Sequence, residues 1–402
     1  MNKNKFLAIL GTRGIPARHG GFETFAERLA LYLTQRAWKV VVYCQGDKSV
    51  RQRIDDTWHG IDRITLPVKR DGAPGTLEFD WACVRDVVKI KPGVALTLGY
   101  NTAIFCAWMR LAGVPNIINM DGLEWRRDKW RMHERAWLWA NERIGCWVGE
   151  HLIADHPAIA EHLATRVSRT KISTIAYGAD EITGADEGPL AGFHLVPNQY
   201  GIVVGRPEPE NSLLEIVRAY SRTKRRAKLI VLGNFQPEKR GYHRRVVESA
   251  SDEVVFPGAI YDAAIVRALR YHARFYLHGH KVGGTNPSLV EALGAGSPVI
   301  AHDNVFNRWV AGAASRYFSS QSQCEDHIDA VLGDDDVVAK MRASSIERFE
   351  TAFQWSEILG QYETLLERYC ELEKAREPVA QAQPATPQKP LSGKSTRIIS
   401  RS

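Results

Sequence analysis

Several features that would assign the chain to a familiar class are missing from its sequence. Its six cysteines form no Cys-x-x-Cys pair, so neither a zinc knuckle nor a disulfide framework is indicated, and we expect reduced thiols in the cytosol. No run of about eighteen apolar residues occurs, so we expect no membrane-spanning helix. The apolar run after Lys3 and Lys5 is too short for a signal peptide.

Motifs of metal and dinucleotide sites are missing as well. No His-Glu-x-x-His spacing occurs, so we expect no metal site. Neither glycine turn, at 11–21 or within 278–303, reads Gly-x-Gly-x-x-Gly with an acidic residue about twenty positions further on, which argues against an oxidoreductase. What is present is 44% hydrophobic content, enough for two domains with separate cores, and a net charge of +7. That charge favours a nucleotide, a nucleic acid or an anionic membrane as partner, without choosing among them.

Short apolar strands alternate with helical patterns, which predicts an α/β chain with doubly wound parallel sheets. Strands are expected at residues 6–10, 40–44, 63–68, 94–98, 116–120, 152–155, 172–176, 201–204, 228–232, 254–256 and 275–277. Helices are expected at 22–36, 125–147, 212–222, 262–271 and 353–369. We therefore predict domains over 1–180 and 200–350, a linker over 181–199, a helical segment over 351–374 and a disordered basic tail over 375–402.

The stretch 278–303 predicts a strand, a glycine turn and a short helix that together bind phosphate. Gly283 and Gly284 permit close backbone approach, and the helix near Ser288 offers free N–H groups and a positive dipole end to a diphosphate. One turn further on, Glu291 can accept hydrogen bonds from a ribose diol. The alternative is a tight turn with a solvated Glu291.

Neighbouring residues fit the same interpretation. Asn286 can cap the helix, and Pro287 suits its first position, where a missing N–H costs nothing. The earlier glycine turn follows the first strand, and ligands of parallel sheets bind beyond the carboxyl ends of the strands. The N–H groups of Gly20 and Gly21 are therefore expected to face the second turn across a cleft.

Three side chains are candidates for chemistry in this cleft. The Arg206 guanidinium can bind phosphate oxygens bidentately, and its alternative is a surface ion pair with Glu208 or Glu210. Asp121 follows an apolar strand and can orient or deprotonate an acceptor hydroxyl, with a helix cap as the alternative. His280 can hydrogen-bond the donor sugar or a phosphate, or it is a structural histidine. Further candidates are His19 and His278.

The segment 125–147 is rich in tryptophan and arginine. As a helix it would place Trp130, Trp137 and Ile144 on one face, while basic residues such as Arg126 and Arg127 crowd its first half. One interpretation is a core helix with a solvated basic side. The other is contact with an anionic membrane surface, because tryptophan and arginine suit the headgroup region.

Four passages occur in the order GTRGIPARHGGFETF, NMDGLEW, GRPEPEN and HGHKVGGTNPSLVEALGAGSPVI. They resemble the family-4 glycosyltransferases of the GT-B fold, and within them bacterial rhamnosyltransferase-like enzymes of surface polysaccharide assembly. The resemblance implies two Rossmann-like domains, acceptor-binding first and donor-binding second, with a C-terminal helix that crosses back to the first. It also implies transfer from a nucleoside diphosphate sugar with the anomeric configuration kept, and no required metal or other cofactor.

Two positions depart from the family pattern. Many members have Glu-x7-Glu ending at the position of Glu291, and Gly283 replaces the first glutamate here. Donor sugar contacts are then left to the backbone amides of Gly283, Gly284, Thr285 and Asn286. The lysine that members carry five residues after the arginine is Asn211 in this chain, which removes a cation from the diphosphate.

The sequence therefore predicts a retaining glycosyltransferase that moves rhamnose or a related hexose from a nucleoside diphosphate sugar to a lipid-linked or oligosaccharide acceptor in bacterial surface polysaccharide biosynthesis. We expect it in the cytoplasm, or peripherally on the inner face of the plasma membrane in contact with anionic lipid, with no nucleic acid partner. Two alternatives stay open. A nucleotide-sugar epimerase of the same fold would need no acceptor, and a catalytically silent relative would bind donor without turning it over.

Overall fold

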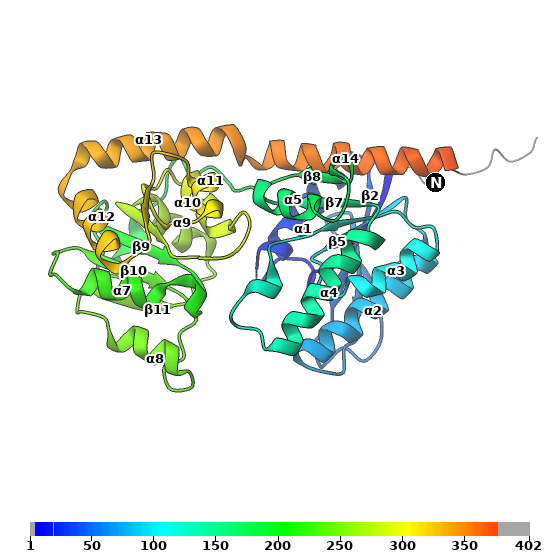
Figure 1. The fold of residues 1–402 in the computed structure, drawn as a ribbon, viewed down its shortest axis with the longest axis horizontal. Coiled ribbons are helices and arrows are strands. Elements are labelled where there is room, and N and C mark those ends of the chain that lie inside the picture. Colours follow the sequence, from blue (N-terminus) through cyan, green and yellow to red (C-terminus); the bar gives the residue numbers. More distant parts are fainter. Residues whose placement is uncertain (1–4, 19, 377–402) are drawn as a thin grey trace, which may run out of the picture.

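The first domain is built on an eight-stranded sheet (Figure 1). Its strands are β1 (Phe6–Leu10), β2 (Lys39–Gln45), β3 (Ile54–Trp58), β4 (Ile61–Leu66), β5 (Val94–Leu98), β6 (Asn116–Asn119), β7 (His151–Ala154) and β8 (Ile172–Thr174). Its helices are α1 (Gly21–Thr34), α2 (Gly72–Ile90), α3 (Ala103–Leu111), α4 (Met132–Val148) and α5 (Pro157–Ala164), with 3-10 turns at Glu124–Arg126 and Arg169–Lys171. The strand order is β3-β4-β2-β1-β5-β6-β7-β8, and neighbours run parallel except β3 and β4.

The second domain is built on a six-stranded parallel sheet in the order β11-β10-β9-β12-β13-β14. Its strands are β9 (Tyr200–Val204), β10 (Lys228–Leu232), β11 (Val254–Gly258), β12 (Phe275–His278), β13 (Val299–His302) and β14 (Arg316–Phe318). Its helices are α6 (Gly188–Ala191), α7 (Leu213–Ser221), α8 (Gly241–Glu248), α9 (Ala263–Tyr271), α10 (Pro287–Gly294), α11 (Val305–Ala311), α12 (Gln321–Gly333) and α13 (Asp335–Ala352), with a 3-10 turn at Pro209–Asn211. The chain then enters α14 (Trp355–Arg376). This computed structural model describes residues 5–18 and 20–376.

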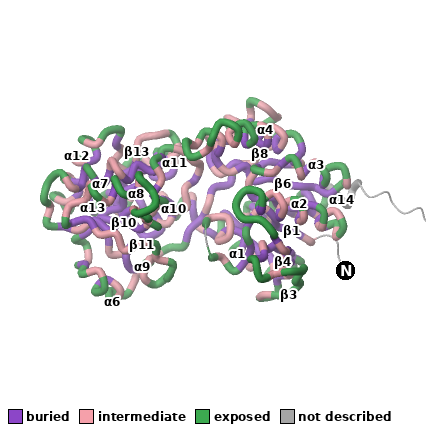
Figure 2. The backbone as a smooth tube through the Cα atoms, turned by 90° about the horizontal axis from the view of Figure 1, so that it is seen from below, coloured by how far each residue is buried: buried purple, intermediate pink, exposed green. Residues whose placement is uncertain are grey.

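Continuous apolar runs form the central strands because a parallel sheet with helices on both faces buries both sides of each strand. β5 is buried at every position, as are β6, β7 and β12. Figure 2 shows this burial concentrated in the interior of each domain. In the first domain, α1 packs with α14 on one face of the sheet, while α2, α3, α4 and α5 cover the other.

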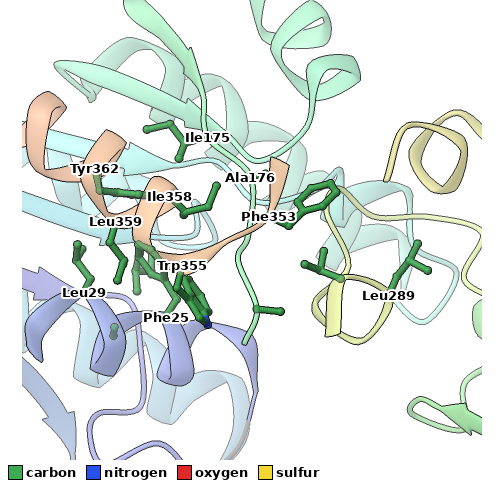
Figure 3. Packing of buried hydrophobic residues seen from close by; sticks show 14 of the residues in the cluster. Phe25, Leu29, Ile175, Ala176, Leu289, Phe353, Trp355, Ile358, Leu359 and Tyr362 are labelled. Atoms are coloured by element: carbon green, nitrogen blue, oxygen red, sulfur yellow. The ribbon is translucent and has the colours of Figure 1, made fainter. Parts of the chain in front are cut away.

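Helices α13 and α14 run one after the other along both domains (Figure 1). α13 packs on the second domain, where the Ser345 hydroxyl donates to the Ser297 carbonyl at 2.8 Å. α14 packs on the first, where the ring centroids of Phe25 and Tyr362 lie 4.6 Å apart (Figure 3). The Asn119 amide donates to the Tyr362 hydroxyl at 2.9 Å. The helix expected to cross back to the first domain therefore does so.

Some expectations need correction. The helix expected over 125–147 begins only at Met132, because its first part forms the 3-10 turn and a loop, so Trp130 shares no helical face with Trp137 and Ile144. The expected linker contains α6, and β3 and β14 were not expected. Residues 375 and 376 belong to α14 rather than to the tail, and 377–402 lie outside the described residues. Within the described ranges, no helix is long and apolar enough to cross a bilayer.

Candidate functional site

The second glycine turn leads into α10 as the sequence predicts. The Asn286 side chain accepts hydrogen bonds from the Ser288 backbone N–H at 3.1 Å and from the Ser288 hydroxyl at 2.8 Å, and Pro287 occupies the first helical position. Asn286 is therefore the helix cap. The cap satisfies one N–H group at the helix start, and the helix dipole makes this end attractive to an anion.

Glu291 lies on α10 one turn from the cap and is oriented by an arginine that the sequence did not single out. The Arg270 guanidinium donates to Glu291 Oε2 at 2.5 Å and to the Ser288 carbonyl at 2.9 Å. Arg270 is 4% exposed, whereas Glu291 is 41% exposed. The alternative of a merely solvated Glu291 is therefore wrong, because a buried arginine fixes one carboxylate oxygen.

The two domains meet at their glycine turns. A Cβ atom on Gly21, at the start of α1, would lie 3.0 Å from Pro287 Cγ. A Cβ atom on Gly122 would lie 3.2 Å from the carbonyl carbon of Gly283. Glycine at these positions lets the backbones of the two domains approach more closely than a side chain would allow. The fold thus brings together the two turns that the sequence placed on either side of one site.

Asp155 of the first domain binds directly to the second turn. Its carboxylate accepts a hydrogen bond from the Thr285 backbone N–H at 2.9 Å, and the Thr285 hydroxyl donates to the Asp155 carbonyl. Any side chain at Gly284 would overlap Asp155 Oδ1, an atom that is buried without a hydrogen-bond partner among the described residues. One of the N–H groups expected to face the donor is therefore taken by a carboxylate in this arrangement.

Asp121 and Asp155 follow the carboxyl ends of the neighbouring strands β6 and β7. Burial raises the pKa of the Asp155 carboxyl to about 7, and the negative charge of Asp121 adds to the shift. Burial also raises the pKa of Asp121, with Glu124 as the next cause. Asp121 has a positive φ of 49° and caps none of the described helices, since the turn at Glu124 is preceded by Leu123 and α4 by Arg131. The cap alternative is therefore wrong.

Cations from both domains lie near the start of the second glycine turn. Arg127 pairs with Glu124 at 2.5 Å and, across the domains, with Glu210 at 3.2 Å. Lys129 pairs with Glu124 at 3.4 Å, and burial lowers the pKa of its ammonium group. The positive charges of Arg127 and Arg206 also contribute to that lowering, which shows that Arg206 lies within electrostatic reach of Lys129.

Arg206 is exposed and belongs to the same group of cations. The carboxylates proposed as its alternative partners are engaged elsewhere, Glu208 with Arg240 and Glu210 with Arg127. No carboxylate within 5–18 and 20–376 forms a salt bridge with Arg206, so the ion-pair alternative is wrong. Asn211 donates from its side-chain amide to the Arg206 carbonyl at 2.8 Å and so holds this loop instead of supplying a charge.

His280 stacks on His278 with ring centroids 4.3 Å apart. Burial and, after it, the charges of Arg127 and Arg206 lower the pKa of His280 to about 3, so its ring is neutral at pH 7. His280 Nδ1 and His278 Nε2 are buried without hydrogen-bond partners in the described part of the chain. His280 can thus offer one hydrogen bond to a neutral group. His19 lies outside the described residues.

Two hollows are lined by described residues. One of about 510 Å³ lies between the domains and is lined by Trp125, Arg126, Arg135, Ala136, Trp139 and Val282. The other, of about 650 Å³, lies at the carboxyl end of α10 and is lined by residues including Leu293, Arg342 and Phe349. Neither lining contains Arg206 or Glu291, which agrees with the close contact of the two domains at the glycine turns.

Comparison with known proteins adds to this geometry. Residues 4–180 match a family model described as "Domain of unknown function (DUF1972)", and no curated protein sequence matches the chain. Sucrose-phosphate synthase from Thermosynechococcus elongatus superposes with a TM-score of 0.72 at 17% identity, over 92% of this chain and 100% of that one. Anabaena Alr3699/HepE in complex with UDP and glucose superposes with a TM-score of 0.72 at 14% identity, over 90% and 99%. The chain has the GT-B fold.

A third structure with the GT-B fold, alpha,alpha-trehalose-phosphate synthase (UDP-forming) from Burkholderia vietnamiensis, superposes with a TM-score of 0.71 at 9% identity, over 90% of this chain and 100% of that one. These likenesses extend over both domains. They confirm the predicted GT-B architecture with its C-terminal helix, while at such low identity the agreement concerns the fold.

Four residues of this candidate site were not predicted: Arg127, Lys129, Asp155 and Arg270. The sequence did contain a signal for Asp155, because this residue follows an apolar strand, as Asp121 does two residues after its own strand. The carboxyl ends of strands line the binding site of parallel sheets. Arg127 and Lys129 were predicted to lie on a helix, and this prediction gave no reason to expect a contact with the second domain. Arg270 lies twenty-one residues before its partner, and no local pattern links them.

Proposed function

We propose that the protein is a glycosyltransferase that uses a nucleoside diphosphate sugar as donor. The observation that carries this proposal is the exposed Arg206 guanidinium, which forms no salt bridge within the described ranges and whose charge acts on His280, next to the second glycine turn, and on Lys129 of the first domain. HepE, which shares the fold, has structures with UDP and with UDP-glucose. A diphosphate fits a site of this kind because a guanidinium and a helix start both bind phosphate oxygens.

Cleaving the bond between sugar and diphosphate develops negative charge on the departing phosphate. Groups that stabilise this charge must already be in place, since reorganisation during the reaction would cost free energy. Arg206 supplies one positive charge from the second domain. Lys129 supplies another from the first domain and compensates for the neutral Asn211. We assign both cations to the leaving diphosphate. We also assign the N–H groups of Gly20 and Gly21 to the stabilisation of its negative charge.

The remaining residues are assigned by their chemistry. Glu291, held by Arg270, accepts from the ribose hydroxyls. The neutral His280 ring and the backbone amides of the turn contact the donor sugar. Asp121 orients the acceptor hydroxyl from the first domain. Donor entry requires the domains to separate, because Asp155 occupies the Thr285 N–H in the closed arrangement.

The finer assignment rests on the resemblance of the four sequence passages to family-4 enzymes. We propose a rhamnosyl or related hexosyl donor, retention of the anomeric configuration, no required metal, and a lipid-linked or oligosaccharide acceptor of bacterial surface polysaccharide biosynthesis. Such an acceptor would place the protein peripherally on the inner face of the plasma membrane.

A thermal-shift panel of thymidine, uridine and guanosine diphosphates and their sugars tests donor binding, because a ligand that binds only the folded state raises the melting temperature. We expect one base family to stabilise the wild type and Arg206→Ala to lose most of the shift. Arg222→Ala is the matched control, since its side chain is 65% exposed on the same domain and pairs with Glu325. The proposal would be contradicted if no nucleotide shifted the melting temperature, or if Arg206→Ala and Arg222→Ala showed equal shifts.

A further inference from the structure

The outer surface of the helical layer α2–α3–α4 is unusually apolar. Exposed large apolar side chains gather on it: Trp81, Ile104, Trp108, Leu111, Met132, Trp137 and Trp147. Leu111 is 81% exposed and Trp147 75%. Single exposed apolar residues need no explanation, but a group of them on adjacent helices marks an interaction surface.

Helix α3 is the centre of this surface. Ala103, Cys106 and Met109 face the core. Ile104, Trp108 and Leu111, at positions i, i+4 and i+7, therefore share the opposite face, which in a soluble protein is normally polar. A helix that is apolar on both faces is adapted to burial on both. The part of the chain that the structure describes covers only the inner face.

The neighbouring helices extend the same surface. The rings of Trp81 on α2 and Trp108 on α3 meet edge to face, with centroids 6.3 Å apart. On the other side, Asn141 of α4 accepts a hydrogen bond from the Ile104 backbone N–H at 3.0 Å. These contacts hold the three helices as one layer over the sheet (Figure 1). We call the outward side of Trp81, Ile104, Trp108, Leu111 and Trp147 the outer aromatic face.

The exposed charges of this face are basic, although one of them, Arg110, also pairs with Glu150 just beyond α4 at 3.6 Å. Within 81–90, 103–111 and 132–148 the exposed Lys and Arg side chains are Arg85, Lys89 and Arg110. The acidic residues of the same segments, Asp86, Glu134 and Glu142, are buried or half-buried. Tryptophan and arginine together suit the interface between lipid headgroups and acyl chains.

We propose that the outer aromatic face docks on an anionic bilayer surface. Trp108 and Leu111 enter the headgroup–acyl boundary, and Arg85, Lys89 and Arg110 contact the lipid phosphates. This rests on the proposed function, because a lipid-linked acceptor would be presented at that surface. A second copy of the chain fits less well, since a two-fold dimer pairs a face with itself and would oppose its own cations.

This surface differs from the one expected from the sequence. The whole segment 125–147, taken as one helix, was the alternative expected to contact lipid. In its basic first half, however, Arg127 and Lys129 pair with Glu124, and Arg127 also pairs with Glu210 of the second domain. The apolar stripe of α3 was not singled out, because a short apolar helix also reads as core. The proposed membrane contact therefore moves from segment 125–147 to the layer formed by α2, α3 and α4.

Sedimentation with vesicles tests the docking. Wild-type protein is mixed with vesicles of phosphatidylglycerol and phosphatidylcholine, and with vesicles of phosphatidylcholine alone. We expect binding to the anionic vesicles, at least roughly tenfold weaker partition for Trp108→Ser with Leu111→Ser, and a loss of roughly fivefold per charge for Arg85→Gln, Lys89→Gln and Arg110→Gln. The matched control is Ile54→Ser with Val305→Ser, which removes exposed apolar residues at 46% and 58% exposure elsewhere.

Two readouts keep the outcome clear. The nucleotide thermal shift measures the proposed function separately, and every variant that retains the wild-type melting temperature and nucleotide response is folded. Failure of vesicle binding by the wild type, or equal binding by the Trp108 and Leu111 double variant, overturns the docking. A stable dimer in size-exclusion chromatography with light scattering that the same double variant dissociates would overturn it in favour of a second copy.

Discussion

The contact between Asp155 and the second glycine turn predicts an unusual dependence of stability on pH. The folded-state pKa of Asp155 is raised to about 7 from an ordinary value of 3.8. Between these values the folded state binds more protons than the unfolded state, so the free energy of unfolding falls as pH rises. A difference of about three units at 1.36 kcal/mol per unit gives a loss of up to ~4 kcal/mol between pH 4 and pH 7, with a plateau above.

Asp155→Asn removes the ionisation and keeps an oxygen that can accept from the Thr285 N–H. We expect this variant to be more stable than the wild type at pH 8, similar to it at pH 4.5, and flatter in between. Denaturant unfolding at several pH values measures the difference. Asp128→Asn is the matched control, because that side chain is 87% exposed on the same domain and should keep the wild-type profile. A wild-type pH profile in Asp155→Asn would refute the reasoning.

Three further predictions follow from the site and the core. Glu291→Ala should weaken donor binding at least about tenfold and leave acceptor KM unchanged; equal losses in both would contradict the ribose role. Lys129→Gln should lower kcat by roughly tenfold to a hundredfold with a smaller change in donor binding, and unchanged turnover would remove it from the leaving-group site. Tyr362→Phe should cost about 1–3 kcal/mol of unfolding free energy, because it leaves the buried Asn119 amide without its acceptor; a loss below about 0.5 kcal/mol would argue against that bond as a link between α14 and the sheet.

The fold was largely predictable because its signals are local. Buried parallel strands read as apolar runs, as in β1 and β5, and the cap of α10 needs only Asn286 and Pro287 in sequence. The strand β3 was not predicted because it is an exposed edge strand, and its sequence IDDTW contains no apolar run. The start of α4 was predicted too early because tryptophan and arginine are compatible with a helix. In the structure, the residues before α4 form a loop in which Arg127 contacts Glu210 of the second domain.

The backbone turns of the candidate site could be predicted from the sequence, but most of the side-chain pairings between the domains could not. The turns at Gly20–Gly21 and Gly283–Gly284 were identified by residues that allow close approach, and the fold brings them together. Pairings such as Asp155 with Thr285 join residues 130 positions apart. Such pairings depend on how the two domains pack against each other, and no periodic pattern in a single sequence indicates that packing.

The most direct test of the central claim follows a labelled sugar from donor to product. Protein is incubated with the nucleotide sugar that gives the largest thermal shift, labelled in the sugar, and with a membrane lipid extract as acceptor source. The account predicts label in a lipid-linked or oligosaccharide product, release of the nucleoside diphosphate, and loss of both in Arg206→Ala. Conversion to a different nucleotide sugar without an acceptor would indicate an epimerase, and donor binding without turnover would indicate a silent relative; either result would contradict the account.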